Sequence, residues 1–252
     1  MLAAVQNGDA KDLAELIGQD PGFKVNMDQD GNGNTFLHFA CLQDSRSVVI
    51  PLLLAHPDID VNAKDIDGWT PFHCACCGRP SCVREMLKDP RVMVNEPGKT
   101  GTTPIWRAAF GGHLDIIKWW IASGREMDLG QPGKYTTDVI GGAKNRDRTE
   151  VVTLLERFEE NPVKTRRAAR VEFGLLDDLA GEMFALVVFV SDGLLQIKDT
   201  TTTTPAARYF KIARSLPLEL QMVLCYRQVG STKEIIPGKE SEVAFKELAR
   251  KL

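Results

Sequence analysis

The sequence lacks an apolar run long enough to cross a membrane. Its longest such run, Met183 to Val190, is bounded by Glu182 and Asp192 and falls far short of the roughly 20 residues that a spanning helix requires. The N-terminal residues also lack the basic stretch followed by apolar residues that marks a secretory leader. We therefore expect a protein of the cytoplasm, or alternatively of the nucleus, with no membrane partner.

The sequence has no excess of basic charge either. Its 31 Lys and Arg residues are opposed by 34 Asp and Glu, which gives a net charge of −3. Residues 1–160 contain 17 basic against 23 acidic side chains, and residues 161–252 contain 14 against 11. The one basic cluster, Thr165 to Arg170, is predicted to be a solvated helix face. Because a nucleic-acid binder gathers its basic groups on one face, no nucleic-acid partner is expected.

Signatures of catalysis are absent as well. The sequence contains no Ser-His-Asp or Cys-His arrangement in a recognisable local pattern, and a general base needs a proton-donating partner within hydrogen-bond reach. The glycine pairs Gly111-Gly112 and Gly141-Gly142 lack the Lys and the Ser or Thr of a phosphate-binding loop. The sequence thus predicts a protein that is not an enzyme, with no catalytic residues, no cofactor and no small-molecule substrate.

Cysteine is present, but disulfides are not needed. The chain has six cysteines among 252 residues, and a chain of this length forms its core without disulfides. Five His and Cys side chains fall within ten residues, and thiolates with imidazole suit zinc. On a helix, Cys74 and Cys77 would share a face while Cys76 points elsewhere. Structural cysteines are therefore preferred over a metal site for the cluster His73, Cys74, Cys76, Cys77 and Cys82.

What the sequence does contain is one short pattern repeated four times. The fifth residue of each copy is His38, His73, Trp106 or Asp138, so successive copies lie 35, 33 and 32 residues apart. A constant spacing of this length predicts a stack of similar units, each burying its apolar face against the next. Such a stack presents a long, shallow surface rather than a catalytic cleft, which favours binding of a protein partner. The copies occupy residues 34–40, 69–75, 102–108 and 134–140.

The second copy resembles the signature of the ankyrin repeat. Thr70 to Ala75 reads Thr-Pro-Phe-His-Cys-Ala, against the family's Thr-Pro-Leu-His-x-Ala. Each copy follows a Gly-containing turn, as at Asp67-Gly68, and glycine suits a hairpin tip that needs positive φ. Asp60 to Ala63 matches the family's closing Asp-Val-Asn-Ala stretch. The resemblance implies an all-α ankyrin-repeat solenoid, in which helix pairs are connected by short hairpin loops.

The repeats and their edges divide the chain into two predicted domains. Residues 1–160 are expected to form the array, with about four to five repeats including caps. The stretch from Leu2 to Ile17 reads as an N-terminal cap of two helices, and Val48 to Leu54 reads as a second helix within a repeat. Residues 161–252 show no further repeat and are expected to form a small C-terminal helical domain.

Helix starts are well marked in the C-terminal domain by capping residues, prolines and first-turn acids. They predict helices over residues 175–190, 205–214, 217–227 and 241–252. Three valines between Met183 and Val190 leave a strand as the alternative for that segment. Leu216 to Leu224 resembles the opening helix of an F-box, which commonly reads Leu-Pro-x-Glu-Leu.

The ankyrin resemblance also implies structural roles for the motif residues. His38 and His73 are expected to hydrogen-bond backbone groups between adjacent repeats. Trp106 takes the place of the motif histidine and is expected in the core. In the pair Trp119-Trp120 one ring should be buried and the other partly exposed. Both glycine pairs fall at the turn between paired helices in this register.

The ankyrin resemblance implies a partner-binding face made of the loop tips and the exposed positions of each first helix. Trp69 and Phe110 are the predicted anchors, because buried aromatic side chains dominate interface hot spots. The alternative is that each ring only covers a neighbouring repeat. The expected partner-binding residues are Asn32, Asn34, Leu42, Gln43, Ile66, Asp67, Trp69, Cys77, Lys99, Thr100, Thr102, Arg107, Phe110, Lys134 and Tyr135.

Two functions remain in contention. In the first, the chain is a non-enzymatic protein–protein interaction scaffold that binds its partner through the concave face of the repeats. In the second, the C-terminal helical domain recruits a ubiquitin ligase, and the chain is its substrate-recruiting adaptor. The partner itself is not identified by the sequence, because binding specificity lies in surface details that repeats vary freely.

Overall fold

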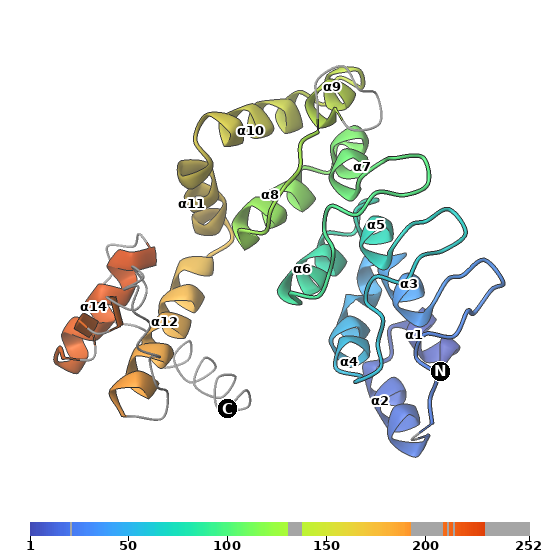
Figure 1. Ribbon diagram of the computed structural model, residues 1–252, viewed down its shortest axis with the longest axis horizontal. Helices are drawn as coiled ribbons and strands as arrows, with labels where there is room; N and C mark the ends of the chain where they lie inside the picture. The colour runs from blue at the N-terminus through green and yellow to red at the C-terminus, as the bar shows by residue number, and fades with distance from the viewer. Residues whose placement is uncertain (21, 131–137, 193–208, 211, 214, 230–252) are drawn as a thin grey trace, which may run out of the picture. The chain divides into compact units, whose positions relative to one another are not determined.

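The computed structural model in Figure 1 describes residues 1–20, 22–130, 138–192, 209–210, 212–213 and 215–229. The chain divides into two compact units, Met1–Ala169 and Arg170–Leu252. The elements assigned among the described residues are all helices. They are α1 (Leu2–Asn7), α2 (Ala10–Gln19), α3 (Phe36–Cys41), η1 (Asp44–Val49), α4 (Ile50–Leu54), α5 (Pro71–Ala75), α6 (Pro80–Lys88), α7 (Pro104–Gly111), α8 (Leu114–Ser123), α9 (Val139–Lys144), α10 (Thr149–Glu160), α11 (Pro162–Glu172), α12 (Leu175–Ser191) and α14 (Leu218–Val229).

The first unit is a stack of helix pairs in two layers. The first helices of the pairs, α3, α5, α7 and α9, contact one another in that order, and the second helices α4, α6, α8 and α10 do the same. The loops that precede α3, α5 and α7 project together to one side of the stack (Figure 1). At the N-terminal end, α1 and α2 form the predicted pair of cap helices. The architecture is the all-α solenoid that the repeat spacing predicts.

The projecting loops are tight hairpins that bond to each other. The Asp65 N–H donates to the Trp69 carbonyl at 3.0 Å within one loop, and the Ile66 N–H reaches the Asn32 carbonyl of the preceding loop at 2.8 Å. Gly33 lies at φ +81°, and a Cβ there would come within 3.1 Å of the Asp65 Cα. Only glycine combines a left-handed backbone with such a close approach. The loop tips therefore form one bonded edge.

The motif histidines connect adjacent repeats, as predicted. At His73 the Nδ1 atom accepts the Thr70 N–H at 3.1 Å, and Nε2 donates to the Thr102 carbonyl of the next repeat at 3.3 Å. His38 makes the same contacts one repeat earlier, with its Nε2 3.0 Å from the Trp69 carbonyl. Burial lowers the pKa of His38 and lowers the pKa of His73 to about 4. Each imidazole is neutral at pH 7, so one nitrogen accepts while the other donates.

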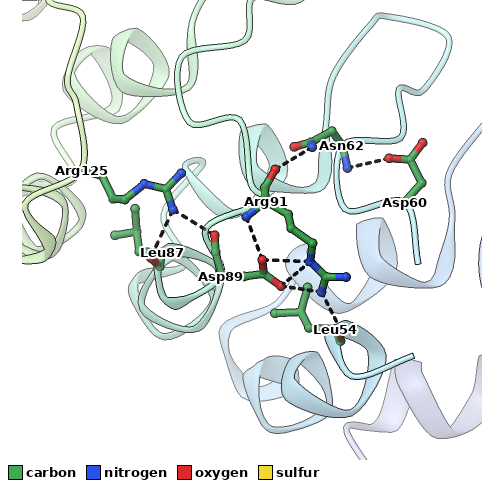
Figure 2. A network of polar contacts seen from close by, with 7 residues as sticks. All are labelled: Leu54, Asp60, Asn62, Leu87, Asp89, Arg91 and Arg125. Carbon is green, nitrogen blue, oxygen red and sulfur yellow. Dashed lines mark hydrogen bonds and ion pairs between the residues drawn. The ribbon is translucent and has the colours of Figure 1, made fainter. Parts of the chain in front are cut away.

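Asparagine side chains form a second kind of bridge. Asn62 Nδ2 donates to the Arg91 carbonyl at 2.9 Å (Figure 2), and its Oδ1 accepts the Met93 N–H at 2.8 Å. Asn26 makes the corresponding two bonds one repeat earlier. Asn62 belongs to the closing stretch that the sequence analysis singled out. That stretch serves to join each repeat to the next.

Where tryptophan replaces the motif histidine, the next repeat has a glycine in contact with it. Trp106 is only 6% exposed, as predicted for a core residue. A Cβ on Gly142 would come within 2.8 Å of the Trp106 Nε1. Both Gly141 and Gly142 lie within α9, so the prediction that this pair forms a turn is wrong. The pair at Gly112, by contrast, does end α7 at φ +79°.

The Trp119-Trp120 pair of α8 divides between core and surface, as predicted. Trp120 is fully buried and packs edge-on against Phe72, with ring centroids 5.1 Å apart. Trp119 is half-buried, and the guanidinium carbon of Arg84 lies 5.0 Å from the centre of its ring. The second-helix layer thus has its own pairing of an arginine with an aromatic ring.

One second helix differs from the prediction. The sequence predicts a continuous helix over Val48 to Leu54, but the 3₁₀ helix η1 ends at Val49 and α4 begins at Ile50. Pro51 lies in the first turn of α4, where its missing N–H and its ring disfavour an α-helix that continues from upstream. The tighter 3₁₀ geometry therefore accounts for the residues before the proline.

The second unit has one apolar core in its described part. It forms between α12 and α14, and its buried members are Ala180, Phe184, Val187, Ala213, Cys225 and Tyr226. α12 covers the segment for which a strand was the alternative, so the helix prediction is confirmed there. The expected helix at 205–214 lies partly, and the one at 241–252 wholly, outside the described residues. No helix in the described ranges is both long and apolar enough to cross a bilayer.

Candidate protein-binding surface

The first predicted anchor, Trp69, contacts an arginine of the next repeat. The guanidinium carbon of Arg107 is 3.9 Å from the centre of the Trp69 ring, well within the range of a cation–π contact. Arg107 Nε also donates to the Cys77 Sγ atom at 3.1 Å. A Cβ on Gly98 would come within 2.8 Å of the Trp69 Cδ1. Trp69 is therefore half-buried and held between two neighbours, and three of the predicted partner-binding residues meet here.

The second predicted anchor, Phe110, is held in a similar way. Its ring stacks on Trp106 with centroids 4.5 Å apart, and the guanidinium carbon of Arg146 lies 4.2 Å from its centre. Arg107 and Phe110 are three residues apart on α7, a spacing that puts them on the same side of a helix. Trp69, Arg107, Phe110 and Arg146 thus form a continuous strip over three repeats, which we name the aromatic–arginine strip.

The asparagines predicted at the first loop tip shape that loop. The amide nitrogens of Asn32 and Asn34 donate to the Asp30 carboxylate at 3.3 and 2.8 Å, and both backbone N–H groups donate to it as well. Desolvation acts to raise the pKa of Asp30, but these hydrogen bonds lower it to about 2. Both side-chain amides therefore donate hydrogen bonds within the loop. Their effect on a partner would come through the loop conformation that these bonds stabilise.

Most of the remaining predicted residues are exposed, Thr102 is half-buried, and two lie outside the described residues. Ile66 is 56% exposed at a loop tip, which makes it the most accessible apolar side chain in the predicted set. The hydroxyl groups of Thr100 and Thr102 lie 3.0 Å apart in the following loop. Lys134 and Tyr135 lie outside the described residues. The other exposed members are Leu42, Gln43, Asp67 and Lys99.

The cysteine cluster belongs mainly to the core. Cys74, Cys76 and Cys82 are buried, and burial raises the pKa of Cys74 and Cys82 to about 12 and that of Cys76 well above its usual value. Because the thiolate is the form that binds metal and attacks electrophiles, these thiols suit packing. Within the described residues, no group of three His, Cys, Asp or Glu side chains is placed to hold a metal ion.

Sequence reasoning missed a group of basic residues beside the strip. Arg79 Nε donates to the Leu42 carbonyl at 2.7 Å, and Arg148 Nε to the Phe110 carbonyl at 3.4 Å. Burial and then the positive charges of Arg79 and Arg148 lower the pKa of His113. The available signal was a glycine followed by a basic residue after two of the first helices, at positions 78–79 and 112–113.

The fold and these contacts define a class of protein, a stack of loop-and-helix-pair repeats joined by histidine and asparagine bridges. A family model described as ankyrin repeats (3 copies) matches residues 1–96 and 49–131, which together cover just over half of the 252 residues. The chain belongs to the ankyrin repeat family. Solenoids of this kind use their extended surface to bind other proteins, so the array is a protein-interaction module.

The relatives are much longer proteins. The chain is 33% identical over 143 residues to SMC5-SMC6 complex localization factor protein 1 of Bos taurus, covering 55% of this chain and 14% of that protein. It is 46% identical over 54 residues to human Rabankyrin-5, covering 21% of this chain and 4% of that protein. This chain therefore spans about one seventh or less of the length of these relatives.

Proposed function

We propose that the chain is a non-enzymatic scaffold that binds a protein partner through the concave face formed by its loops and first helices. The aromatic–arginine strip carries the proposal, because it presents Trp69, Arg107, Phe110 and Arg146 together across three repeats. Tryptophan and arginine are enriched among the residues that dominate binding energy. The bovine relative is named for localization of a protein complex, which fits a segment that binds proteins.

Pre-orientation of the strip also supports this function. Arg107 is fixed by Trp69 on one side and by the Cys77 thiol on the other. A side chain that is already held in place loses less conformational entropy when a partner docks on it. The half-buried rings offer apolar area beside those fixed charges, a combination that a partner can both desolvate and pair with.

The test is affinity capture of the partner with the full-length chain and three variants. Trp69→Ala and Phe110→Ala should each weaken binding by about 2 kcal/mol, roughly thirtyfold in dissociation constant, if the rings are anchors. Trp119→Ala is the matched control, because Trp119 is also half-buried beside an arginine but lies in the second-helix layer. Equal losses from all three variants would show that the strip has no special role. Circular dichroism and melting temperature must be measured in parallel, because a steep fall in melting temperature would identify Trp69 and Phe110 as core residues.

A second candidate function is recruitment of a ubiquitin ligase by the C-terminal unit. The observation in its favour is that Leu218 and Leu220, in the segment that resembles an F-box opening helix, are 52% and 51% exposed. Exposed leucines at a helix start are available to a partner rather than to the core. Replacing both leucines by aspartate in the full-length chain separates the two functions. An adaptor would keep its client and lose the ligase component, whereas a scaffold would recover no ligase component in either form.

A further inference from the structure

Four arginines of the array contact the C-terminal part of a first helix and retain hydrogen-bond donors. Arg107 Nε bonds to the Cys77 thiol and Arg148 Nε to the Phe110 carbonyl. A guanidinium has five N–H donors, so each of these contacts leaves several unused. We name this group the first-helix arginines, which are Arg79, Arg107, Arg146 and Arg148.

No acidic side chain among the described residues pairs with these arginines. Other basic groups of the array do form ion pairs among the described residues, for example Lys64, Lys88, Arg91 and Lys144. Asp147 lies between Arg146 and Arg148 in the sequence, yet it forms an ion pair with neither. The first-helix arginines are thus positive groups without a partner carboxylate in an array whose residues 1–160 contain more acidic than basic side chains.

Glycines bring these basic side chains close to the preceding repeat. A Cβ on Gly112 would come within 2.7 Å of the Arg148 Cδ, and a Cβ on Gly78 would come within 2.8 Å of the His113 ring. Burial lowers the pKa of His113, and the positive charges of Arg79 and Arg148 lower it further. The basic groups therefore form a row of positive potential that runs across neighbouring repeats.

We propose that this row binds an extended, acidic segment of the protein partner, with carboxylates at about every third residue. The arginine fork matches a carboxylate with two parallel hydrogen bonds, and Arg79, Arg107 and Arg146 belong to three consecutive repeats. Packed helices lie about 8–10 Å apart, and an extended chain rises about 3.3 Å per residue, so one repeat corresponds to about three residues of the partner. This inference rests on the proposed function and names the partner class for the same surface.

Fluorescence anisotropy with the full-length chain at low ionic strength tests the inference. The probe is a fluorescein-labelled peptide of about twelve residues with glutamate at every third position among serines and one phenylalanine, a spacing set by the strand rise of about 3.3 Å. A second peptide has the same composition with its glutamates contiguous, and a third replaces glutamate by lysine. The spaced peptide should bind about fivefold or more tightly than the contiguous one, and the lysine peptide should not bind, because complementary charge and register decide affinity here.

A matched pair of charge reversals locates the binding site. Arg146 and Arg84 are both exposed, and each contacts one aromatic ring, at 4.2 and 5.0 Å from the ring centre. Arg146→Glu should weaken binding of the spaced peptide about tenfold or more, because the peptide's carboxylates would then face a like charge. Arg84→Glu should change the affinity less than about twofold, because Arg84 lies in the second-helix layer, away from the proposed site. Among the described residues, the exposed Arg146 side chain contacts only the Phe110 ring. The far-UV circular dichroism of Arg146→Glu should therefore match that of the wild type.

Three outcomes would overturn the inference. They are no binding of the spaced peptide to the wild type, equal losses from Arg146→Glu and Arg84→Glu, and tighter binding of a peptide in which phosphoserine replaces each glutamate. The last result would reassign the row to a phosphorylated partner. If the peptide fails while Trp69→Ala still abolishes partner capture, the partner class is wrong and the proposed function stands. If both fail, the surface itself has been misassigned.

Discussion

Arginines connect repeats on the second-helix side of the array, whereas buried histidines are the main connection on the first-helix side. On the second-helix side, each arginine donates to carbonyls at the C-terminal end of a helix in a preceding repeat, where backbone acceptors lack intrahelical partners. The contacts are Arg91 to Leu54, Arg125 to Leu87 and Asp89 (Figure 2), and Arg166 to Ile121. These arginines are components of the fold.

On the first-helix side the joints are made by the neutral imidazoles of His38 and His73. Among the arginines there, Arg146 and Arg148 are exposed, and Arg148 adds one long carbonyl contact of 3.4 Å. Arg79 is half-buried and donates to the Leu42 carbonyl at 2.7 Å. Arginine thus serves two purposes in the same array. Where an arginine satisfies helix ends it stabilises the stack, whereas exposed arginines such as Arg146, beside the histidine joints, remain available for binding.

The largest expected effect concerns the histidine joints and acid. Burial holds the pKa of His73 at about 4, against about 6.5 in an unfolded chain. Because the folded pKa is depressed, the contribution of His73 is complete above pH 6.5 and is lost as pH falls towards 4. The loss amounts to about 3 kcal/mol of unfolding free energy. Urea denaturation of the wild type and of His73→Gln at several pH values measures this loss. The difference in unfolding free energy between the two proteins should shrink by about 3 kcal/mol from pH 7 to pH 4. A gap that stays constant would contradict the assignment.

A smaller effect is expected from an arginine of the second-helix side. Arg125→Ala removes hydrogen bonds to the Asp89 and Val92 carbonyls, of which the first is 2.9 Å long. Because charged hydrogen bonds that satisfy partly buried acceptors are worth more than exposed ones, the free energy of unfolding should fall by about 2 kcal/mol. Chemical denaturation of the full-length chain provides the measurement. A change below about 0.5 kcal/mol would place Arg125 with ordinary surface residues.

The smallest effect is expected from an arginine of the first-helix side. Arg148 is exposed and makes a single contact of 3.4 Å with the Phe110 carbonyl. Arg148→Ala should therefore change the free energy of unfolding by less than about 0.5 kcal/mol. The same denaturation experiment compares its change in unfolding free energy with that of Arg125→Ala. If the two variants were equally destabilised, the distinction between structural and available arginines would be lost.

The repeat spacing and motif were sufficient to predict the array. The intervals between His38, His73, Trp106 and Asp138 reflect one stacking unit, so the helix pairs and histidine joints could be read directly. The 3₁₀ helix before Pro51 escaped prediction because the apolar pattern around it is compatible with either helical geometry. The placement of Gly142 within a helix also escaped it, since only the packed indole of Trp106 explains a glycine there.

The binding surface was less predictable than the fold. Trp69 and Phe110 stand out because the repeat itself needs neither ring, but their arginine partners come from the following repeat and are 36 or more residues away. Contacts over such separations depend on side-chain conformations that no local pattern specifies. Arg79 and His113 were missed for the same reason. The role of the named residues in binding a partner stays a prediction until it is measured.

The glycine beneath Trp106 determines which repeats could be exchanged during evolution or engineering. Four residues after the motif position, the earlier repeats carry Leu42, Cys77 or Phe110, whereas the last carries Gly142. None of those three side chains would fit against the indole, where even a Cβ would come within 2.8 Å. Repeats with histidine joints are interchangeable parts, because each joint uses the same backbone acceptor. Trp106 and Gly142 depend on each other, so the last two repeats must stay together. Additional repeats could be inserted only in the middle of the array.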